Sequence, residues 1–588
     1  MKHSEHLTLA NLLAWLVPVA LTLPNVYICM LGSMKGAECA ALLLPLGGYM
    51  LLATASTNTP RTTVMLFPVM FIGAFQIVVS YLYHDGSPIG VDMFLNVWTT
   101  NLTEVDELLS SLVLPVALVV VLYLPLTVAA AVAWRRHRRA APDVVRLWRR
   151  VGLAAGGAGV AACAWCLVAL PTYRVSTRLF PVNALYNLKE AVERQYRMAH
   201  YSSLSAHFSY HARGTHGKGR ELYIAVVGET SRADNWQLMG YGRRTNPLLT
   251  GYGDSIVAFG RAFSESNTTH KSVPMLLNTL ASEHYDEGLY SHKSIITAFR
   301  EAGFHTTFLS VQRPNRSMIE WYAHEAQTVR YVEGRLGMPA LDGSIVPLVD
   351  AAMADRRHDK QLIVVHLYGS HYDYADRYPA QYAVFRPDHH RQANAGTPPA
   401  LLNPYANTIV YTDHVLAELI GRLRAVDYNA ALIYSSDHGE DIFDDARNKF
   451  LHASPVPTYW QLHVPLLVYM NPAYAAAYPA LRANALRNRP KRVSTSKSYA
   501  PTLLHLAGID TRYTNDTLSL LSPLLRTQTK LKYLTDLDES VDLDEWGFSD
   551  YDKEQLKIMN GYEQQETHHY PRTGMPGRGH TPRSGRNH

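Results

Sequence analysis

Five apolar stretches dominate the first 171 residues of this 588-residue chain, and each is long enough to cross a lipid bilayer. They lie at about 11–32, 37–55, 62–82, 110–134 and 151–171. A bilayer core takes roughly 20 consecutive apolar residues. A soluble protein that buried five such helices in succession would have little polar surface left. We therefore expect residues 1–171 to form a five-helix transmembrane domain.

An arginine-rich loop sets the expected orientation of these spans. The segment WRRHRRAAPDVVRLWRR follows the fourth stretch, and loops rich in Lys and Arg stay on the cytoplasmic side. Counting back puts the N-terminus in the cytoplasm, and counting forward puts the loop 83–109 and everything after residue 171 on the opposite side. The first stretch is too long for a signal-peptide core and is followed by further spans, which predicts an uncleaved anchor.

The rest of the chain has the pattern of an α/β protein. Residues 172–220 are expected to be a connector, in which YNLKEAVERQYRMA has the spacing of a helix on a membrane surface. Over residues 221–525 helical patterns alternate with short apolar runs: ELYIAVV, HTTFLSV, QLIVVHLY, AALIYSS and VPLLVYM. This alternation predicts a domain with a central, largely parallel sheet. Residues 526–588 are expected to be an acidic segment followed by a disordered basic tail rich in Gly, Pro and Arg.

Charge and cysteine content exclude two classes of function. The net charge of +5 is small for this length, and the part after residue 171 has no long basic stripe. Nucleic acid is therefore not an expected partner. All four cysteines lie in or beside the apolar stretches, at Cys29, Cys39, Cys163 and Cys166. The later part of the chain thus has neither a disulfide framework nor a thiolate metal site.

Two predicted strands end in ionisable side chains. ELYIAVV leads into Glu229, and AALIYSS leads into Asp437 and His438. One imidazole and two carboxylates make a suitable zinc set that still leaves a position for a further ligand or a substrate. Asp-His-Gly alone also makes an ordinary turn. The interpretation depends on two such strand ends, because ligands gather beyond the carboxyl ends of strands in α/β sheets.

The stretch NTTHKSVP, residues 267–274, offers hydroxyls that could complete this metal set. Coordination lowers the pKa of a hydroxyl and turns it into a nucleophile. By itself the stretch would be an N-cap or a turn. His371 and His452 follow two further apolar runs and could bind a second zinc or hold phosphate oxygens. His366, inside a predicted strand, is expected to be a core or supporting residue.

Taken together, these motifs resemble those of the phosphoethanolamine transferases that modify lipid A and core sugars, within the alkaline phosphatase/sulfatase superfamily. VVGETSRADNWQLMGYGRRTNP looks like their signature, SSDHGE like their metal-binding Asp-His pair, and GSHYDYADRYP and KFLHASP like their two later His segments. SNTTHKSVPML resembles their nucleophile loop, in which the attacking threonine precedes x-x-Ser-x-Pro. The resemblance, which extends to about residue 525, implies that Thr269 is the nucleophile and a metal ligand, rather than Thr268 or Thr230.

The resemblance also implies substrate-binding residues. FLNVWTTNLTEVDELL is similar to a segment of the family's membrane domain whose Asn, Thr and Glu bind substrate, and here these are Asn96, Thr100 and Glu104. Their spacing of four places them on one face of a helix. FLSVQRPNRSMIEW stands where the best-known members have Asn-Asn-Ser-x-x-Lys, so Arg313, Arg316 and Ser317 are expected to hold phosphate. The cysteines that flank the family's nucleophile loop are replaced by Glu265 and Met275.

By this resemblance the chain would transfer phosphoethanolamine from phosphatidylethanolamine to lipopolysaccharide, on lipid A or the inner core. The reaction would pass through a covalent intermediate on Thr269 at a zinc site, with one zinc bound tightly and room for a second during turnover. The protein would be a multi-pass inner-membrane protein with its catalytic domain in the periplasm, and its product would bind cationic peptides such as polymyxin more weakly.

Three alternatives stay open at this point. One is a glycerol-phosphate transferase of the lipoteichoic acid synthase type, and another is a related membrane-anchored phosphatase or sulfatase. The third, from a different class, is a catalytically dead scaffold that binds lipid. Zinc content separates the last from the others, because a dead scaffold has no need of two metal-ready strand ends.

Overall fold

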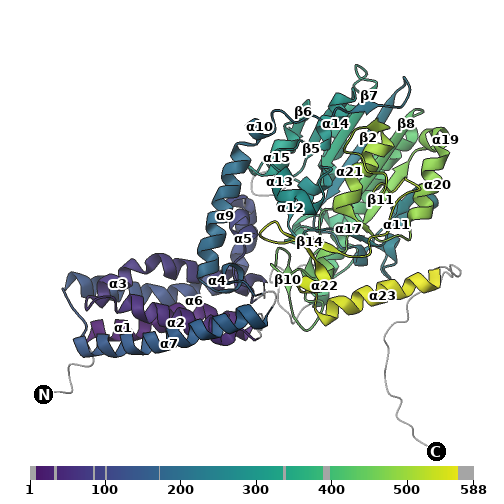
Figure 1. Ribbon diagram of the computed structural model, residues 1–588. Helices are drawn as coiled ribbons and strands as arrows, with labels where there is room; N and C mark the ends of the chain where they lie inside the picture. Colours follow the sequence, from purple (N-terminus) through teal and green to yellow (C-terminus); the bar gives the residue numbers. More distant parts are fainter. Residues whose placement is uncertain are drawn as a thin grey trace, which may run out of the picture.

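The computed structural model describes residues 8–31, 36–83, 86–99, 102–170, 173–334, 340–388 and 398–566. An N-terminal helical bundle and a larger α/β domain lie side by side, and helix α9 (Val182–Ala199) runs from one to the other (Figure 1). The short helices α5 (Val91–Thr99), α8 (Val175–Arg178) and α10 (Tyr201–Leu204) accompany it. Helix α9 lies within the predicted connector. Its proposed position on the membrane surface stays a prediction.

The bundle consists of α1 (Leu9–Met30), α2 (Glu38–Ala53), α3 (Thr59–Met65), α4 (Phe67–Tyr83), α6 (Leu102–Arg135) and α7 (Pro142–Ala169). Among the described residues, α1, α7 and the part of α6 from Leu112 are long and apolar enough to cross a membrane. Helices α3 and α4 make a fourth span only if they count as one helix bent by 52°. The expected count of five is therefore not confirmed, because the second apolar stretch forms a helix of only 16 residues.

Helices α2 and α7 pack unusually closely because glycines line their contact. A Cβ on Gly47 would lie 2.4 Å from the backbone nitrogen of Gly156, and one on Gly159 would lie 2.4 Å from that of Leu44. Small residues let helix backbones approach in this way inside membranes. The short α2 is thereby held against the long α7.

A seven-stranded sheet forms the centre of the α/β domain, in the order β3-β11-β8-β2-β7-β5-β6. Its strands are β2 (Glu221–Gly228), β3 (Ile256–Ala258), β5 (His305–Ser310), β6 (Thr328–Tyr331), β7 (Lys360–His366), β8 (Asn429–Ser436) and β11 (Leu466–Met470). All five predicted strands are present. The five from β8 to β6 are parallel, but β11 runs antiparallel to both β8 and β3, so the sheet is mixed.

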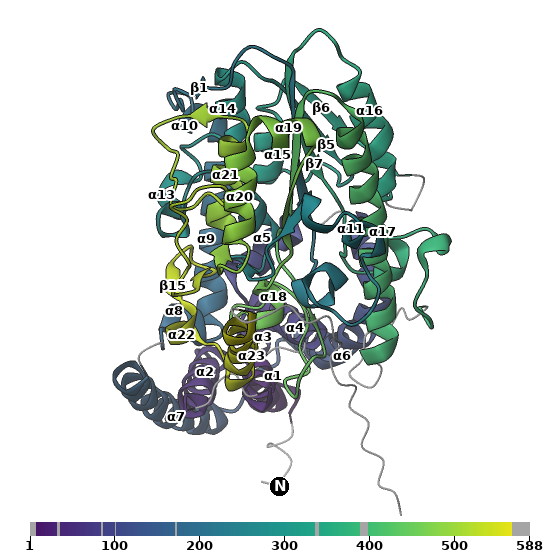
Figure 2. The same cartoon turned by 90° about the vertical axis from the view of Figure 1, so that its right-hand side faces the viewer.

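Helices cover both faces of the sheet, each with its own apolar core (Figures 1 and 2). One layer contains α12 (Thr269–Leu276), α14 (Ile295–Glu301), α15 (Met318–Ala323), α19 (Pro472–Ala477), α20 (Pro479–Asn488) and α21 (Thr495–Leu506). The other contains α11 (Pro247–Thr250), α16 (Val346–Met353) and α17 (Pro398–Ala425). The strands are buried on both faces, which explains why their sequences are continuous apolar runs.

Small elements complete the domain. Four two-stranded pairs are β1 (Arg213–Gly214) with β13 (Ile509–Asp510), β4 (Ala262–Phe263) with β12 (Val493–Ser494), β9 (Asp441–Ile442) with β10 (Phe450–Leu451), and β14 (Lys532–Leu534) with β15 (Ser540–Asp542). The short helices α13 (Tyr285–Gly288) and α18 (Tyr459–Leu462) lie in loops. The acidic segment after residue 526 is folded, since α22 (Leu543–Trp546) and α23 (Asp550–Glu566) follow the last hairpin. The predicted disordered tail lies outside the described residues.

Candidate metal centre and nucleophile

The carboxyl ends of β2 and β8 bring three predicted metal ligands together. The two strands are neighbours, and Glu229 follows β2 just as Asp437 and His438 follow β8. His438 Nε2 lies 3.5 Å from Glu229 Oε1 and 3.3 Å from Asp437 Oδ2. All three side chains are buried, and one ligand atom from each lies within 4.8 Å of the other two. The pairing of β2 with β8 thus brings together Glu229 and the Asp437–His438 pair, which are over 200 positions apart in the sequence.

This donor set fits a divalent cation. Burial, and then the neighbouring Asp437, raise the pKa of Glu229 to about 8, and burial raises the pKa of Asp437 to about 7. Burial lowers the pKa of His438 to about 4, so its imidazole is neutral. Its Nδ1 lies 2.9 Å from the carbonyl oxygen of Gly439, which can only accept. Nε2 therefore keeps its lone pair and faces the carboxylates, an arrangement that suits zinc.

Thr269 lies against this group. It is the first residue of α12, and its Oγ1 is 3.2 and 3.3 Å from the two carboxylate oxygens of Glu229 and 3.1 Å from His438 Nε2. Thr268 turns away, with its hydroxyl 3.2 Å from that of Ser266. The hydroxyl of Thr230 donates to Glu229 at 2.6 Å and is fully buried. Of the three threonines, Thr269 is the one that is both at the metal set and partly accessible.

Several supporting contacts were not predicted from the sequence. Asp437 accepts from the backbone N–H of Thr230 at 3.0 Å and from the hydroxyl of Ser272 at 3.1 Å. Gln312, after β5, donates to Glu229 at 3.2 Å. A Cβ on Gly369 would lie 2.5 Å from the carbonyl oxygen of Glu229, and its φ of +54° also favours glycine. These groups fix the carboxylates in place, as outer partners of metal ligands do.

His371 and His452 lie beside the metal set rather than within it. The ring of His452 is 4.3 Å from that of His438 and 6.1 Å from that of His371, measured between centroids. The Nδ1 atom of His452 lies 3.1 Å from Glu440, whose pKa burial raises to about 8. His366 is buried in β7, 3.2 Å from the hydroxyl of Ser310, which agrees with the core position expected for it, and a supporting role at the metal set stays a prediction.

The predicted substrate-binding residues do not gather at one site in the part of the chain that the structure describes. Asn96 on α5 is hydrogen-bonded to Tyr83, which lies close enough to Glu440 to interact with it electrostatically. Thr100 lies outside the described residues, and Glu104 lies in α6 at a position whose side chain is not described. Arg313 and Arg316 are exposed, and no described contact connects either to the metal set. Ser317 is buried and caps α15 through Ile319 N–H at 3.3 Å.

An unpredicted ion-pair network joins helix α12, which begins at Thr269, to the bundle side of the molecule. Asp92 on α5 lies 2.8 Å from the ammonium of Lys271 and 3.0 Å from His270 Nε2, and both partners directly follow Thr269. Lys271 also pairs with Asp538 at 3.0 Å, and Asp538 pairs with Arg194 of α9 at 3.2 Å. These ion pairs therefore connect four segments that are distant in the sequence: α5, α9, α12 and the loop at Asp538.

A second group of possible metal ligands, His305, Asp355 and His358, lies at the opposite end of the sheet. It fits a metal poorly. The carboxylate of Asp355 is already bound by the guanidinium of Arg357, and the two imidazoles stack face to face with an interplanar angle of 6°. Parallel rings direct their nitrogen lone pairs side by side rather than toward one ion.

The sulfatase family model matches residues 221–509, and this part of the chain is accordingly a sulfatase-family domain. Within that family, the chain is related by sequence to the phosphoethanolamine transferases. Phosphoethanolamine transferase EptA of Salmonella typhimurium is 29% identical over 324 residues, which are 53% of this chain and 57% of the relative. The chain thus spans little more than half the length of such curated relatives.

Two solved structures share the fold. Full-length lipooligosaccharide phosphoethanolamine transferase A from Neisseria meningitidis, an integral membrane protein, superposes with a TM-score of 0.67 at 21% identity, over 87% of this chain and 97% of that one. The C-terminal periplasmic domain of EptC from Escherichia coli, in complex with zinc, gives 0.52 at 23% identity, over 58% of this chain and 97% of that one. The first match covers helical bundle and α/β domain together.

Proposed function

We propose that this protein transfers phosphoethanolamine from phosphatidylethanolamine to lipopolysaccharide through a covalent intermediate on Thr269. The observation that carries the proposal is the position of Thr269 Oγ1, within 3.1 to 3.3 Å of Glu229 and His438. A hydroxyl in that position can be activated as a nucleophile by a shared cation. The activity named for the relatives supports the choice of phosphoethanolamine as the group transferred.

Zinc is the cation that we propose for this site. Glu229, Asp437, His438 and Thr269 would hold it, since two carboxylates, a neutral imidazole and a hydroxyl make a tetrahedral set. When bound, it lowers the pKa of the Thr269 hydroxyl and neutralises the two buried carboxylates. His371 and His452 lie within reach of the same space and would hold phosphate oxygens or a second ion.

In the first half-reaction, Thr269 Oγ1 forms a bond to phosphorus while the bond from phosphorus to the glycerol oxygen breaks. The proton lost by Thr269 ends on that oxygen, and diacylglycerol leaves. Thr269 and His270 begin α12, and the start of a helix favours anions such as the transferred phosphate. In the second half-reaction an oxygen of the acceptor attacks phosphorus, its proton returns to Oγ1, and Thr269 is free again.

A membrane-bound donor agrees with the placement of the site. Tyr83, at the end of the bundle helix α4 and hydrogen-bonded to Asn96, lies close enough to Glu440 to interact with it electrostatically. A phospholipid would thus be taken up directly from the bilayer that holds the bundle. We propose a multi-pass inner-membrane protein with its α/β domain in the periplasm, where both the donor headgroup and lipid A are accessible.

Incubation of purified protein with labelled lipids tests this function. Phosphatidylethanolamine without an acceptor should release diacylglycerol and leave the labelled phosphoethanolamine on the Thr269 peptide. Phosphatidylglycerol should leave no label, whereas a glycerol-phosphate transferase would show the reverse preference. Mass spectrometry of lipid A and core from cells with and without the protein identifies the acceptor. A purified protein that labels no residue with either donor would refute the proposal.

A further inference from the structure

His452 lies in a segment whose backbone is unfavourable on both sides of it. Its two neighbours, Leu451 and Ala453, both have a φ of +64°, in the left-handed region that residues with a Cβ rarely adopt. Both neighbours are buried, whereas the side chain of His452 is 16% exposed, with its Nδ1 atom 3.1 Å from Glu440. A backbone of this kind persists only where surrounding contacts hold it in place.

Asn267, two residues before Thr269, supplies such contacts. Its side-chain amide donates to the carbonyl oxygen of Ser454 at 2.8 Å, and its backbone carbonyl accepts from the N–H of Ala453 at 3.1 Å. Ala453 and Ser454 are the two residues that directly follow His452. Asn267 therefore connects the loop that leads into Thr269 with the segment that carries His452, although Asn267 and Ser454 are 187 positions apart in the sequence.

Further contacts fix the Asn267 side chain itself. Its amide also donates to Gln461 Oε1 at 2.6 Å, and its Oδ1 accepts from the hydroxyl of Tyr533 at 2.9 Å. Gln461 in turn donates to the carbonyl oxygen of Leu451 at 3.4 Å, on the other side of His452. Asn267, Gln461 and Tyr533 are all buried. Hydrogen bonds between buried groups are costly to leave unmade, so these contacts confine the amide to one orientation.

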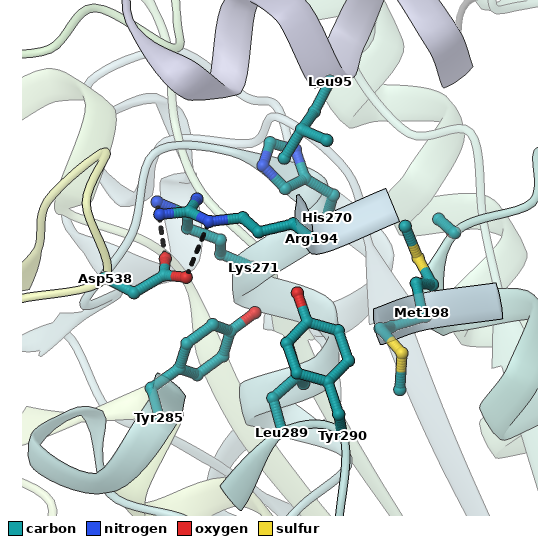
Figure 3. A pocket seen from close by; sticks show the side chains of 11 residues that line it. Leu95, Arg194, Met198, His270, Lys271, Tyr285, Leu289, Tyr290 and Asp538 are labelled. Atoms are coloured by element: carbon teal, nitrogen blue, oxygen red, sulfur yellow. Dashed lines mark ion pairs between the residues drawn. The ribbon is translucent and has the colours of Figure 1, made fainter. Parts of the chain in front are cut away.

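The residues after Thr269 are fixed by different partners. Lys271 pairs with Asp538, which also binds Arg194 of α9 (Figure 3). The contacts of Lys271 thus relate Thr269 to α9, whereas the contacts of Asn267 relate it to His452. Thr269 is held from both directions along the chain, and each direction fixes its position relative to a different part of the molecule.

We propose that Asn267 is a positioning residue that sets the distance between the Thr269 hydroxyl and the His452 imidazole. This inference rests on the proposed function, in which Thr269 attacks phosphorus and His452 holds phosphate oxygens or a second ion. Without the Asn267 amide, the left-handed turns at Leu451 and Ala453 relax, and His452 moves away from the phosphate. A displacement of about 1 Å at a reaction centre can slow the reaction by about 100-fold.

A double-mutant cycle tests this role with the full-length protein in detergent. The quantity measured is the rate of diacylglycerol release from phosphatidylethanolamine in a single turnover. Asn267→Ala should slow release by up to about 100-fold, but should cause no further slowing in a His452→Ala background, because it acts through that imidazole. Its zinc content should equal that of the wild type.

Asn488→Ala is the matched control for the loss of a buried amide. Asn488 is buried and donates to two backbone carbonyls, those of Leu520 and Ser522, at 2.9 and 2.8 Å. Its replacement should lower the Tm as that of Asn267 does, because both leave buried carbonyls without a donor. It should leave the rate unchanged in both backgrounds, which separates a lost hydrogen bond from a displaced His452.

Hydrogen exchange measured by mass spectrometry observes the same contact without a substrate. In Asn267→Ala the peptide covering residues 449–456 should exchange about tenfold faster, since one to two hydrogen bonds are lost. Adding Ala453→Gly should restore part of both the slow exchange and the rate, because glycine adopts a positive φ without strain. If Asn267→Ala does not fold, Tyr533→Phe, which removes only the hydroxyl that donates to Asn267, should give the same changes at a smaller size.

The outcomes distinguish this inference from the proposed function. Rate losses of Asn267→Ala and His452→Ala that multiply in the double variant, loss of zinc in Asn267→Ala, or unchanged exchange of residues 449–456 would each overturn the positioning role. Faster exchange of that peptide, in a protein whose wild type releases no diacylglycerol, would refute the proposed function and still support the contact between Asn267 and the His452 segment.

Discussion

Replacing Lys271 by Met should destabilise the contact between α5 and α12, the helix that begins at Thr269. In the wild type the Lys271 ammonium lies between the carboxylates of Asp92 and Asp538, and the three side chains are 2%, 2% and 3% exposed. Met has a similar length but no charge. The change therefore leaves two buried carboxylates near each other without their shared cation.

The size of the effect follows from what remains around Asp92. Removing one partner of a buried ion pair costs about 3–5 kcal/mol. Arg194 Nη1 at 3.5 Å and His270 Nε2 at 3.0 Å still face the Asp92 carboxylate, so the lower end, about 3 kcal/mol, is expected. For a domain of this size a loss of about 1 kcal/mol lowers the Tm by roughly 2 °C, which predicts a decrease of about 6 °C.

The pH dependence provides a second signature. Burial raises the pKa of Asp92, but Lys271, His270 and Arg194 together hold it well below its ordinary value. A carboxyl with a depressed pKa in the folded state stabilises the fold above its unfolded pKa, about 3.9, and this stabilisation is lost as the pH falls toward the folded value. Lys271→Met removes the largest attraction, so the pKa of Asp92 rises and its stabilising contribution is lost at a higher pH.

Thermal unfolding of the full-length protein in detergent measures both quantities. Asp92→Asn combined with Lys271→Met should recover most of the lost Tm, because neither charge is then left alone. Lys530→Met, at an exposed ion pair, should leave the Tm unchanged. If Lys271→Met melts like the wild type between pH 4 and 8, or if the double variant is no more stable than the single one, the network does not stabilise the fold.

The other predictions concern the site and the topology. Thr269→Ala should abolish diacylglycerol release while Thr268→Ala keeps substantial activity, and the opposite result would show that the nucleophile is misassigned. Asp437→Ala and His438→Ala should lose both bound zinc and activity, as measured by elemental analysis and turnover. His371→Ala and His452→Ala should keep the zinc and turn over slowly, and loss of zinc in these two would place them in the primary metal set. A reporter that is active only outside the cytoplasm should be active after residue 175 and silent within 136–148; the reverse would place the metal set in the cytoplasm.

The sequence predicts the centre of the fold well because local signals determine it. A strand buried on both faces must be apolar along its length, so β2, β5, β7, β8 and β11 are visible as runs that stop at polar residues. The direction of β11 is not visible in this way, since a buried antiparallel strand has the same composition as a parallel one. The edge strands β3 and β6 were not predicted, because strands of three and four residues are too short to show a clear apolar pattern.

The meeting of Glu229, Asp437 and His438 was predictable for a related reason, whereas Thr269 was assigned by the family resemblance. Glu229, Asp437 and His438 directly follow apolar strands, and strand pairing alone then determines that they meet. Gln312 also follows a strand, but an amide after a strand is too common to be noticed. The contacts of Asp92 with His270 and Lys271 join residues almost 180 positions apart, and no period or motif relates them.

That long-range network also affects how Thr269, the proposed nucleophile, is positioned. Thr269 begins a helix of only eight residues, which is too short to be stable without tertiary contacts. Its N-terminal turn is held on one side by Ser272, which binds Asp437, and on the other by His270 and Lys271, which bind Asp92. The first contact belongs to the metal set and the second to the helices that continue into the bundle. Docking of the α/β domain on the α5 and α9 helices and formation of the metal set therefore stabilise the same turn. A change at either end should shift the Thr269 hydroxyl relative to Glu229.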